Sequence, residues 1–284
     1  MIQRPHLSCY INLLQAAIQE DMPFGDITTS CTIAATAEGR AVILAKEAGL
    51  LAGLFVAEEV FRLIDQRLQC QAMFEEGALI QKGDILMEIT GPLASILMGE
   101  RLALNLLQRL CGIATQTAAF VRELQGTCCR ILDTRKTTPG LRVLEKYAVR
   151  VGGGHNHRFS LSDGVLIKDN HIAACGSITK AVERVRQNAP HTLAIQCEVS
   201  NMEELQEALA AQVNAVLLDN MDIQGLKKAV EFIRNTAPHV LIEASGGVTI
   251  KNIREIALTG VDMVSSGYLT HSVKALDISL RIQR

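Results

Sequence analysis

The chain has 284 residues, of which 48% are hydrophobic, 20% are charged and 21 are glycines. This composition is typical of an α/β protein with one large domain and one smaller domain. The formal net charge of −2, the absence of tryptophan and the aromatic content of only 4% exclude a general basic surface and a base-stacking platform, so we expect no nucleic-acid partner.

The first twenty residues predict an amphipathic helix rather than a signal peptide, because Ile11, Leu14 and Ile18 recur at helical spacing. The longest apolar run, residues 48–57, is too short to cross a bilayer, so no membrane partner is expected. The eight cysteines include no C-x-x-C pair, which argues against a zinc site or a disulfide framework. We interpret them as reduced, mostly buried thiols of a cytoplasmic protein.

Residues 40–91 predict the strands of a small sheet, since short alternating runs are separated by glycine-containing turns. Residues 95–110 have helical periodicity, and Gly112 is expected to end or kink this helix before a second one that reaches Leu124. These patterns predict an N-terminal α/β domain over residues 1–112.

The residue pattern changes after Arg130. Apolar, β-branched runs there alternate with helical stretches, as in βαβ units with a parallel sheet. The six predicted strands are 130–133, 164–168, 193–198, 215–219, 240–244 and 261–265, and the helices are expected to begin near Ser177, Ser200, Asp222 and Thr249. We therefore predict an open α/β barrel over residues 113–268, with residues 269–284 packing back onto the first domain.

Polar residues close almost every predicted strand, namely Lys168, Glu198, Asp219, Ser245 and Ser266. The carboxyl ends of barrel strands meet at one mouth, where ligands bind. The sequence therefore predicts a site at this edge.

Two glycine-containing turns follow the last two predicted strands, Ser245-Gly246-Gly247-Val and Ser265-Ser266-Gly267. Glycine lets backbone N–H groups approach a phosphate, and a helix opening at Thr249 would add its dipole. Because barrel enzymes bind phosphate at this position, we expect a sugar-phosphate site here. The alternative is that both glycines only make tight turns.

Positive charge is concentrated between Arg130 and His171, where eight Arg or Lys residues accompany four acids. We assign three of the eight, Arg142, Lys146 and Arg150, to a solvated helix face. Four others lie at strand ends or in the turn 152–158, where a guanidinium can grip a carboxylate through two hydrogen bonds. These candidates for an acidic small molecule are Arg135, Lys136, Arg158 and Lys168.

Two pairs of side chains leave alternatives open. His155 and His157 alternate like metal ligands but lack a nearby third ligand, so His157 is weighed as a hydrogen-bonding residue for the ligand instead. Glu198 and Asp219 could orient sugar hydroxyls, hold a hydrated Mg²⁺, or stabilise positive charge at a sugar carbon, or they could form structural ion pairs.

At these residues the sequence closely resembles the quinolinate phosphoribosyltransferases, also called nicotinate-nucleotide pyrophosphorylases (carboxylating). The block Asp133-Thr-Arg-Lys-Thr-Thr-Pro-Gly140 together with the later Arg158 is specific to this family, unlike the glycine pairs. The resemblance also covers Glu20-Asp21, Gly25-Asp26-Ile-Thr28, Glu100-Arg101-Leu-Ala-Leu-Asn105, Gly152-Gly-Gly-His-Asn-His-Arg158, Leu166-Ile-Lys-Asp-Asn-His171, Glu198, Asp219, Ser245-Gly-Gly and Leu269-Thr-His-Ser.

The resemblance implies an N-terminal α/β sandwich, an incomplete barrel and a homodimer, or a higher oligomer, in which Arg101 reaches the neighbouring subunit's site. It implies that phosphoribosyl pyrophosphate and quinolinate give nicotinate mononucleotide, pyrophosphate and CO₂ for NAD biosynthesis, with Mg²⁺ as cofactor. The substrate-binding residues carried over are Arg101, Thr134, Arg135, Lys136, His157, Arg158, Lys168, Glu198, Asp219, Ser245, Gly246, Gly247, Ser266, Gly267 and Tyr268.

Roles follow from the same resemblance. Lys136, Glu198 and Asp219 are the expected catalytic residues. Glu198 and Asp219 are also the expected Mg²⁺ ligands, directly or through water. Tyr268 departs from the small residue expected after the glycine, which changes the shape of the phosphate end. No residue is assigned to the loss of CO₂.

Three other functions remain open at this point. A related phosphoribosyltransferase for another acidic base, or a molybdenum-transport-associated relative, would share the scaffold. A barrel aldolase or decarboxylase would use Lys168 as a Schiff-base lysine. A non-catalytic carrier or binding module is suggested only by the Gly77 to Gly91 hairpin, which contains Lys82.

Overall fold

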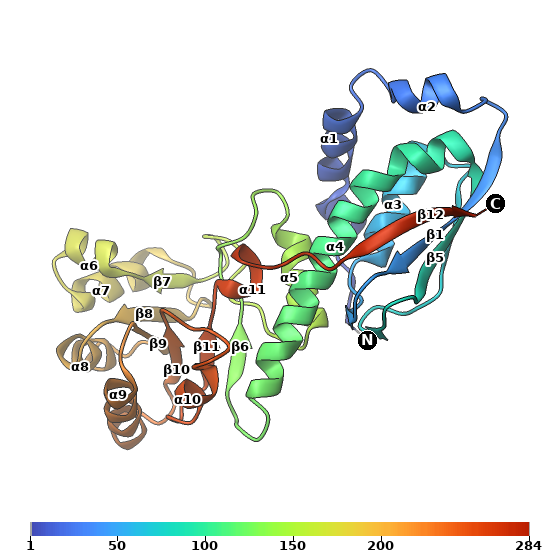
Figure 1. Cartoon of the computed structure of the whole chain (residues 1–284). Helices are drawn as coiled ribbons and strands as arrows, with labels where there is room; N and C mark the ends of the chain where they lie inside the picture. The colour runs from blue at the N-terminus through green and yellow to red at the C-terminus, as the bar shows by residue number, and fades with distance from the viewer. Residues whose placement is uncertain (1, 284) are drawn as a thin grey trace. The chain divides into compact units, whose positions relative to one another are not determined.

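The computed structural model describes residues 2–283, which form two compact units (Figure 1). The first unit takes its chain from three places, the residues up to Ala118, Thr137–Gly153, and the residues from Leu269 on. The second unit consists of Ala119–Lys136 and Gly154–Tyr268. The units differ at two points from the predicted division into 1–112 and 113–268, because residues 113–118 and residues 137–153 belong to the first unit.

The first unit contains an antiparallel four-stranded sheet of order β12-β1-β5-β3 and a separate pair, β2 with β4. Its two long central strands are those predicted from alternating polarity, and their partner β12 comes from the C-terminal segment, with Ala41 opposite Ile282. The strands are β1 (Glu38–Ala45), β2 (Gly49–Leu50), β3 (Gln69–Ala72), β4 (Leu79–Ile80), β5 (Ile85–Pro92) and β12 (Ile278–Gln283).

Helices accompany this sheet, and α3 and α4 are in direct contact. A Cβ at Gly99 of α4 would lie 2.6 Å from the Phe61 ring of α3, so this glycine permits the close approach. The predicted N-terminal helix is present as α1, with Leu14 buried. The helices are η1 (Leu7–Cys9), α1 (Ile11–Asp21), α2 (Ile27–Thr32), α3 (Leu54–Ile64), α4 (Leu93–Glu123), α5 (Arg142–Val151) and α11 (Tyr268–His271).

Helix α4 corrects one prediction, because it continues through Gly112 without a break. A Cβ at Gly112 would collide with the carbonyl oxygen of Lys274, so the glycine lets the C-terminal segment pass against the helix. Gln108 fixes the same crossing, since its backbone oxygen accepts from the Leu276 amide at 3.0 Å and its side chain donates to the Ile278 oxygen at 2.6 Å. Packing therefore outweighs the low helix propensity of glycine.

Helix α5 corrects a second prediction. Lys146 was assigned to a solvated face together with Arg142 and Arg150, yet its side chain is buried, with only 3% of the residue exposed. Arg150 is exposed as expected. The neighbouring Glu145 is fully buried and receives a hydrogen bond from Arg109 of α4 at 2.7 Å, so this helix is held by charged groups inside the first unit.

The second unit is built on a six-stranded, wholly parallel sheet of order β6-β11-β10-β9-β8-β7. All six predicted strands are confirmed. The two ends of the sheet, β6 and β7, are not paired with each other, which makes the barrel incomplete. The strands are β6 (Arg130–Leu132), β7 (Val165–Ile167), β8 (Ile195–Val199), β9 (Ala215–Asp219), β10 (Leu241–Ser245) and β11 (Met263–Ser265).

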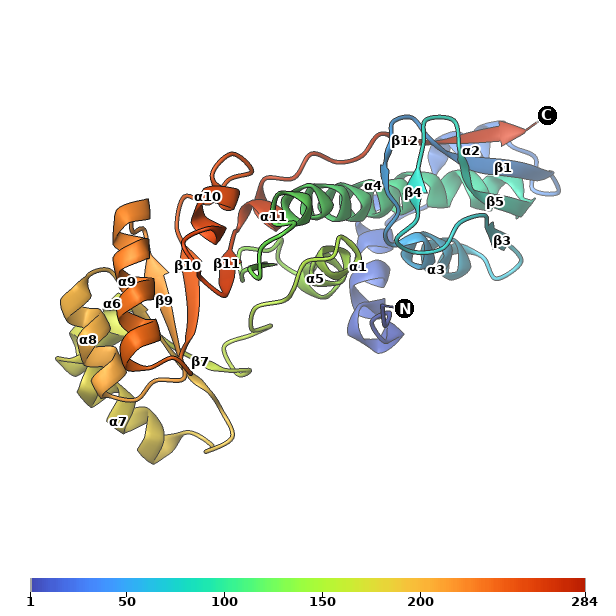
Figure 2. The same ribbon diagram turned by 90° about the horizontal axis from the view of Figure 1, so that it is seen from below.

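Helices of the second unit lie along the outer side of this sheet, as the views of α7, α8 and α9 show (Figure 2). The side chains of Ser177 and Asp222 cap α7 and α9 as predicted, and Asn201 caps α8 one residue after the expected Ser200. The helices are α6 (Asp169–Cys175), α7 (Ile178–Asn188), α8 (Met202–Ala210), α9 (Ile223–Thr236) and α10 (Ile253–Ala257).

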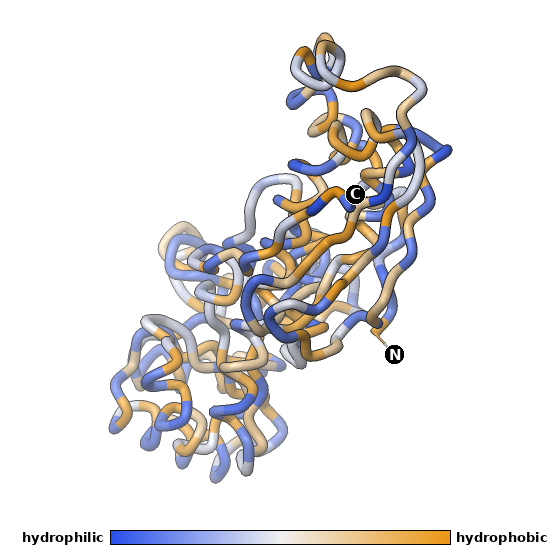
Figure 3. The backbone as a smooth tube through the Cα atoms, turned by 45° about the vertical axis from the view of Figure 1, so that its right-hand side comes forward, coloured by the Kyte–Doolittle hydropathy of each residue, from blue (hydrophilic) through white to orange (hydrophobic). Residues whose placement is uncertain are grey.

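Apolar stretches occur throughout both units, whereas many connecting segments are polar (Figure 3). The cores are aliphatic, and the largest fully buried side chains include Phe61, Leu86 and Leu104 in the first unit. Within residues 2–283, no helix combines the length and the apolar character needed to span a membrane.

Candidate active site

The polar residues that close the strands of the second unit lie at one edge of the sheet. Register places Ser245 opposite Asp219 across β10 and β9, and it places Ile167 opposite Cys197, so Lys168 and Glu198 follow side by side. Ser265, just before Ser266, pairs with Leu132 at the end of β6. The predicted gathering of strand ends is therefore present.

Lys168 and Glu198 form an ion pair between the ends of β7 and β8. The side chain of Lys168 is 44% exposed and that of Glu198 13%, so the ammonium remains accessible while the carboxylate is largely covered. An entering carboxylate can compete for Lys168 and thereby release Glu198. The ion pair therefore links the positions of the two side chains.

The glycine-rich turn that ends at Arg158 is held by Asp133, which directly follows β6 and is fully buried. Asp133 accepts hydrogen bonds from the side chain of Asn156 at 2.6 Å and from the amide of His157 at 2.9 Å. The turn also runs beside β6, with the His155 amide donating to the Ile131 oxygen at 2.9 Å. Asp133 belongs to the resemblance block, and the structure gives it a positional role.

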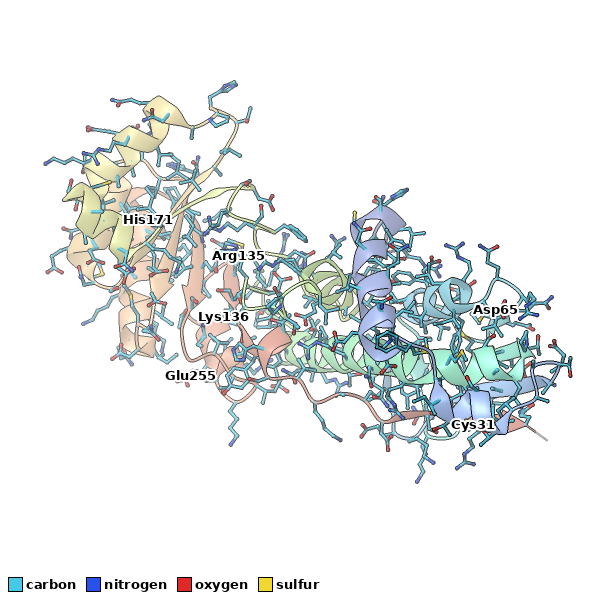
Figure 4. The ribbon with its side chains drawn as sticks, turned by 90° about the horizontal axis from the view of Figure 1, so that it is seen from above. Cys31, Asp65, Arg135, Lys136, His171 and Glu255 are labelled. Carbon is cyan, nitrogen blue, oxygen red and sulfur yellow. The ribbon has the colours of Figure 1, made fainter. Side chains whose placement is uncertain are left out.

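Three cations lie on these two segments. Arg135 and Lys136 follow β6 and are exposed (Figure 4), and the Lys136 amide donates to the Thr134 hydroxyl at 3.0 Å. Arg158 is partly buried and donates to the Gly164 oxygen at 2.9 Å. Burial, and next the positive charge of Arg135, lower the pKa of the Arg158 guanidinium from its usual value. Two like charges near each other make a bound anion favourable here.

His157 is tied by both ring nitrogens. Nδ1 accepts a hydrogen bond from the Arg158 amide at 2.7 Å, so the ring proton resides on Nε2, which lies 3.4 Å from Oε2 of Glu243. Its neighbour His155 is exposed. Among residues 2–283 no group of three or more His, Cys, Asp or Glu residues is arranged to hold a metal ion.

Glu243 was not identified from the sequence, although it is a buried acid inside β10, only 1% exposed. Its Oε2 also accepts from Gln196 of β8 at 2.7 Å. Burial raises the pKa of Glu243, but the side chains of His157, Ser265 and Gln196 outweigh burial and hold the pKa below its usual value. One sequence signal was available, a charged residue within the apolar run Val-Leu-Ile-Glu-Ala.

Asp219 at the end of β9 accepts a hydrogen bond from the side chain of Asn220 at 2.7 Å. Asn220 has a left-handed backbone, with φ of 53°, and its amide donates to the Ser245 oxygen at 2.9 Å. A Cβ at Gly246 would occupy the place of the Asn220 side chain. The first glycine of the predicted phosphate turn is therefore required, and Asn220 connects this turn to Asp219.

The two predicted phosphate turns are joined by Ser266, which is 3% exposed. Its hydroxyl donates to the Val248 oxygen at 3.0 Å and accepts from the Tyr268 amide at 3.3 Å. The helix expected at Thr249 begins only at Ile253, because the Asn252 side chain first closes a turn, accepting from the Thr249 amide at 2.7 Å. Helix α10 has only five residues, so it adds little dipole to the turn at Gly246 and Gly247 that was predicted to bind a phosphate.

Arg101 is the one predicted ligand that lies in the first unit, on α4. Its side chain is 61% exposed and lies 3.7 Å from the adjacent Glu100. All other predicted site residues belong to the second unit, from Thr134 to Tyr268.

Comparison with known proteins identifies the family of the chain. Residues 26–111 match the family model of the quinolinate phosphoribosyl transferase N-terminal domain, and residues 113–281 match that of its C-terminal domain. Curated relatives include probable nicotinate-nucleotide pyrophosphorylases (carboxylating) of Synechocystis sp., 47% identical, and of Bacillus subtilis, 46% identical. Each of these comparisons covers 95% of this chain and 92% of the relative.

Solved structures of the same family superpose closely on this chain. NadC from Streptococcus pyogenes superposes with a TM-score of 0.93 at 42% identity over 99% of both chains. A nicotinate-nucleotide pyrophosphorylase from Ehrlichia chaffeensis superposes with a TM-score of 0.92 at 39% identity, over 99% of this chain and all of that one. The chain therefore belongs to the quinolinate phosphoribosyltransferase family.

Proposed function

We propose that the chain transfers a phosphoribosyl group from phosphoribosyl pyrophosphate to quinolinate, giving nicotinate mononucleotide, pyrophosphate and CO₂. The observation that carries this proposal is that Arg135, Arg158 and Lys168 lie at the carboxyl edge of the parallel sheet that also presents Glu198 and Asp219. Arg135 and Arg158 repel each other, which adds to burial in lowering the pKa of Arg158. A dicarboxylate placed between them would relieve that repulsion. Each charge-assisted hydrogen bond would contribute roughly 1.5 to 3 kcal/mol.

In this proposal the cations bind the two adjacent carboxylates of quinolinate. Arg135 and Arg158 provide guanidinium forks, Lys168 leaves Glu198 for a carboxylate, and Lys136 contacts the diphosphate. Ser245, Gly246 and Gly247 bind the 5′-phosphate, and Ser266, Gly267 and Tyr268 shape the other side of that site. Glu198 and Asp219 then face the sugar, where their charge stabilises the positive carbon that develops during transfer.

The pyridine nitrogen attacks the sugar carbon, and pyrophosphate departs. Quaternised nitrogen withdraws electrons from the ring, so the neighbouring carboxylate can leave as CO₂, and the electron pair that stays on the ring carbon takes up a proton from water. The residues around the ring mainly position and neutralise the substrate during this step. We assign no acid or base to it.

Mg²⁺ fits the donors present. Mg²⁺ is usually held by one or two carboxylates together with substrate phosphates, and Glu198 and Asp219 supply two carboxylates at neighbouring strand ends. When bound there, the cation would neutralise charge on the departing pyrophosphate. The assignment of Mg²⁺ and of its ligands is part of the proposal.

The oligomer is also part of the proposal. Arg101 is exposed and lies outside the unit that carries the other ligands. In a symmetric homodimer, Arg101 of one subunit would complete the site of the other subunit.

The proposed function is tested by measuring turnover with two candidate substrates, quinolinate and nicotinate. The purified protein is given phosphoribosyl pyrophosphate and Mg²⁺ with either quinolinate, labelled in the carboxylate next to nitrogen, or nicotinate. We expect labelled CO₂ and nicotinate mononucleotide in equal amounts from quinolinate alone. Product from nicotinate but not from quinolinate would replace the proposal with a transferase for a monocarboxylate base.

A Schiff-base mechanism at Lys168 is tested in parallel. The Lys168 amine is engaged in an ion pair with Glu198, and an ion-paired ammonium is not a nucleophile. Borohydride should therefore trap no substrate on the protein, as followed by mass. A trapped adduct on Lys168 would favour the aldolase-like alternative instead.

A further inference from the structure

Glu243 stands apart from the acids at the strand ends because it is buried within the sheet. It lies two residues before Ser245 on β10, so both side chains project to the same face of the strand. An acid that is 1% exposed remains ionised only where other groups compensate the lost hydration. Its hydrogen-bonding partners therefore identify its role.

Two side chains converge on one oxygen of Glu243. Gln196 of β8 donates to Oε2 at 2.7 Å, and Nε2 of His157 lies 3.4 Å from the same atom. The other oxygen, Oε1, is buried and accepts no hydrogen bond of normal geometry. Oε2 is thus the acceptor that orients the His157 ring.

The orientation of this ring is transmitted to Arg158. With its proton on Nε2, the ring presents an unprotonated Nδ1, which accepts the Arg158 amide at 2.7 Å. The next contact along the chain is the Arg158 guanidinium with the Gly164 oxygen at 2.9 Å. A continuous series of hydrogen bonds therefore connects Gln196, Glu243, His157 and the backbone of Arg158.

We propose that Glu243 is a positioning residue, which selects the Nε2-protonated form of His157 and so holds Arg158 in place to receive a carboxylate of the base. This inference rests on the proposed function for the identity of the base. It assigns Glu243 no contact with the substrate and no part in proton transfer.

The first pair of variants distinguishes the loss of the hydrogen-bond acceptor at residue 243 from the loss of its negative charge. Glu243→Met has nearly the same shape but no acceptor, whereas Glu243→Gln keeps one oxygen that can accept from both Gln196 and His157. We expect Glu243→Met to weaken quinolinate binding at least about tenfold, as displacement of a binding group does. Glu243→Gln should stay within about threefold of the unaltered protein. Equal losses in both variants would overturn the proposal.

Binding of quinolinate and of phosphoribosyl pyrophosphate with Mg²⁺ is measured separately by calorimetry. Glu243→Met should weaken quinolinate binding more than binding of the second substrate. Glu243 meets the turn Ser265-Ser266-Gly267 only through the Ser265 side chain, whereas the series of hydrogen bonds through His157 ends at Arg158. Asp262→Asn is the matched control. Asp262 contacts Arg234 at 2.6 Å and the Ile242 amide at 2.7 Å, at the amino end of β10. It should lower stability without changing the ratio of the two affinities.

A spectroscopic measurement on the free protein is independent of the reaction. ¹⁵N-labelled histidine reports which ring nitrogen carries the proton, and His157→Asn identifies the signal among the seven histidines. We expect the Nε2-protonated form in the unaltered protein and in Glu243→Gln, and a mixture of forms in Glu243→Met. An unchanged ring signal in Glu243→Met would refute the positioning role.

If Glu243→Met does not fold, Gln196→Leu replaces it, because this change releases Oε2 from the side opposite His157. Gln196→Leu should change the His157 ring signal and weaken quinolinate binding, as expected for Glu243→Met. If neither the ring signal nor the binding changes, the positioning role is refuted. Failure of the unaltered protein to bind quinolinate would instead reject the proposed function. The ring signal would still decide whether Glu243 holds His157.

Discussion

Arg158 is the residue on which the candidate site most depends, since it is partly buried, fixed at both its backbone and its side chain, and close to a like charge. A guanidinium retains two parallel donors for a carboxylate, whereas an ammonium is a single compact charge. The two cations are therefore not interchangeable at this position.

Arg158→Lys tests the fork directly. We expect the dissociation constant for quinolinate to rise at least about tenfold, because one charge-assisted hydrogen bond is lost, while binding of phosphoribosyl pyrophosphate changes little. Titration calorimetry with each substrate measures both. Arg186→Lys is the control, since Arg186 lies on α7, away from the strand ends, and donates to the Gln212 oxygen at 2.8 Å. Equal weakening of both substrates would show that Arg158 supports the fold rather than the base.

The cysteines behave less uniformly than expected, because Cys9, Cys31 and Cys128 are exposed while Cys111, Cys129 and Cys197 are buried. Cys70 and Cys175 are partly exposed, so only three of the eight cysteines are buried and the prediction of mostly buried thiols was wrong. Burial raises the pKa of Cys111, Cys129 and Cys197 to about 12 each.

This difference predicts an order of alkylation. At pH 8, four pH units below a pKa of about 12, the buried thiols carry almost no thiolate, which is the reactive form. Iodoacetamide should therefore modify Cys9, Cys31 and Cys128 first, as peptide mass analysis would show. The denatured chain, in which every thiol is accessible, provides the reference. Fast modification of Cys197 in the folded protein would contradict the burial described here.

At the scale of elements, the turn after β10 needs a glycine because a side chain from the end of the neighbouring strand β9 packs against it. Gly246 has a φ of 95°, and the Asn220 side chain occupies the place of its missing Cβ. Gly176 at the end of α6 has a similar φ of 91°, but no atom lies within 4 Å of its Cβ position.

Replacing each of the two glycines by alanine distinguishes the cost of backbone strain from the cost of a collision with a neighbouring side chain. Gly176→Ala should cost about 1 to 2 kcal/mol in the free energy of unfolding, the cost of a left-handed non-glycine residue. Gly246→Ala should cost more and should also weaken phosphoribosyl pyrophosphate binding, because Asn220 must leave Asp219. Urea unfolding and calorimetry measure the two effects. Similar unfolding costs with intact binding would show that Asn220 moves away freely.

The sequence predicted elements better than it predicted their contacts. The six strands of the second unit were found because each is an apolar run bounded by turn residues, as in Ala215–Asp219. The continuation of α4 through Gly112 was missed because the reason, the passage of Lys274, lies far along the chain. Glu243 was missed for the same reason, since His157 and Gln196 come from other segments.

At the scale of the whole molecule, the proposed shared site predicts complementation between variants. Arg101→Ala and Lys168→Ala should each be nearly inactive alone, and reassociation of an equal mixture should restore about a quarter of the sites. Half of the reassembled dimers would be mixed, and one of the two sites in each mixed dimer would contain neither change. Random subunit exchange is confirmed by mass, and each variant reassembled alone is the control.

Recovery at the level of the single variants, despite proven exchange, would place Arg101 in the site of its own subunit or outside any site. The same measurement would then remove the need for a homodimer from the proposal.

The pairing of β12 with β1 has a consequence for how the protein is made. Strand β1 lies inside the first sheet, with β5 on one side and β12 on the other, yet β12 is synthesised after all the other helices and strands of the two units. Until Ile278–Gln283 leave the ribosome, the backbone groups of Glu38–Ala45 present an open edge on which another nascent chain can add a strand. Strains that terminate synthesis early should therefore accumulate this protein as aggregates rather than as a shortened enzyme.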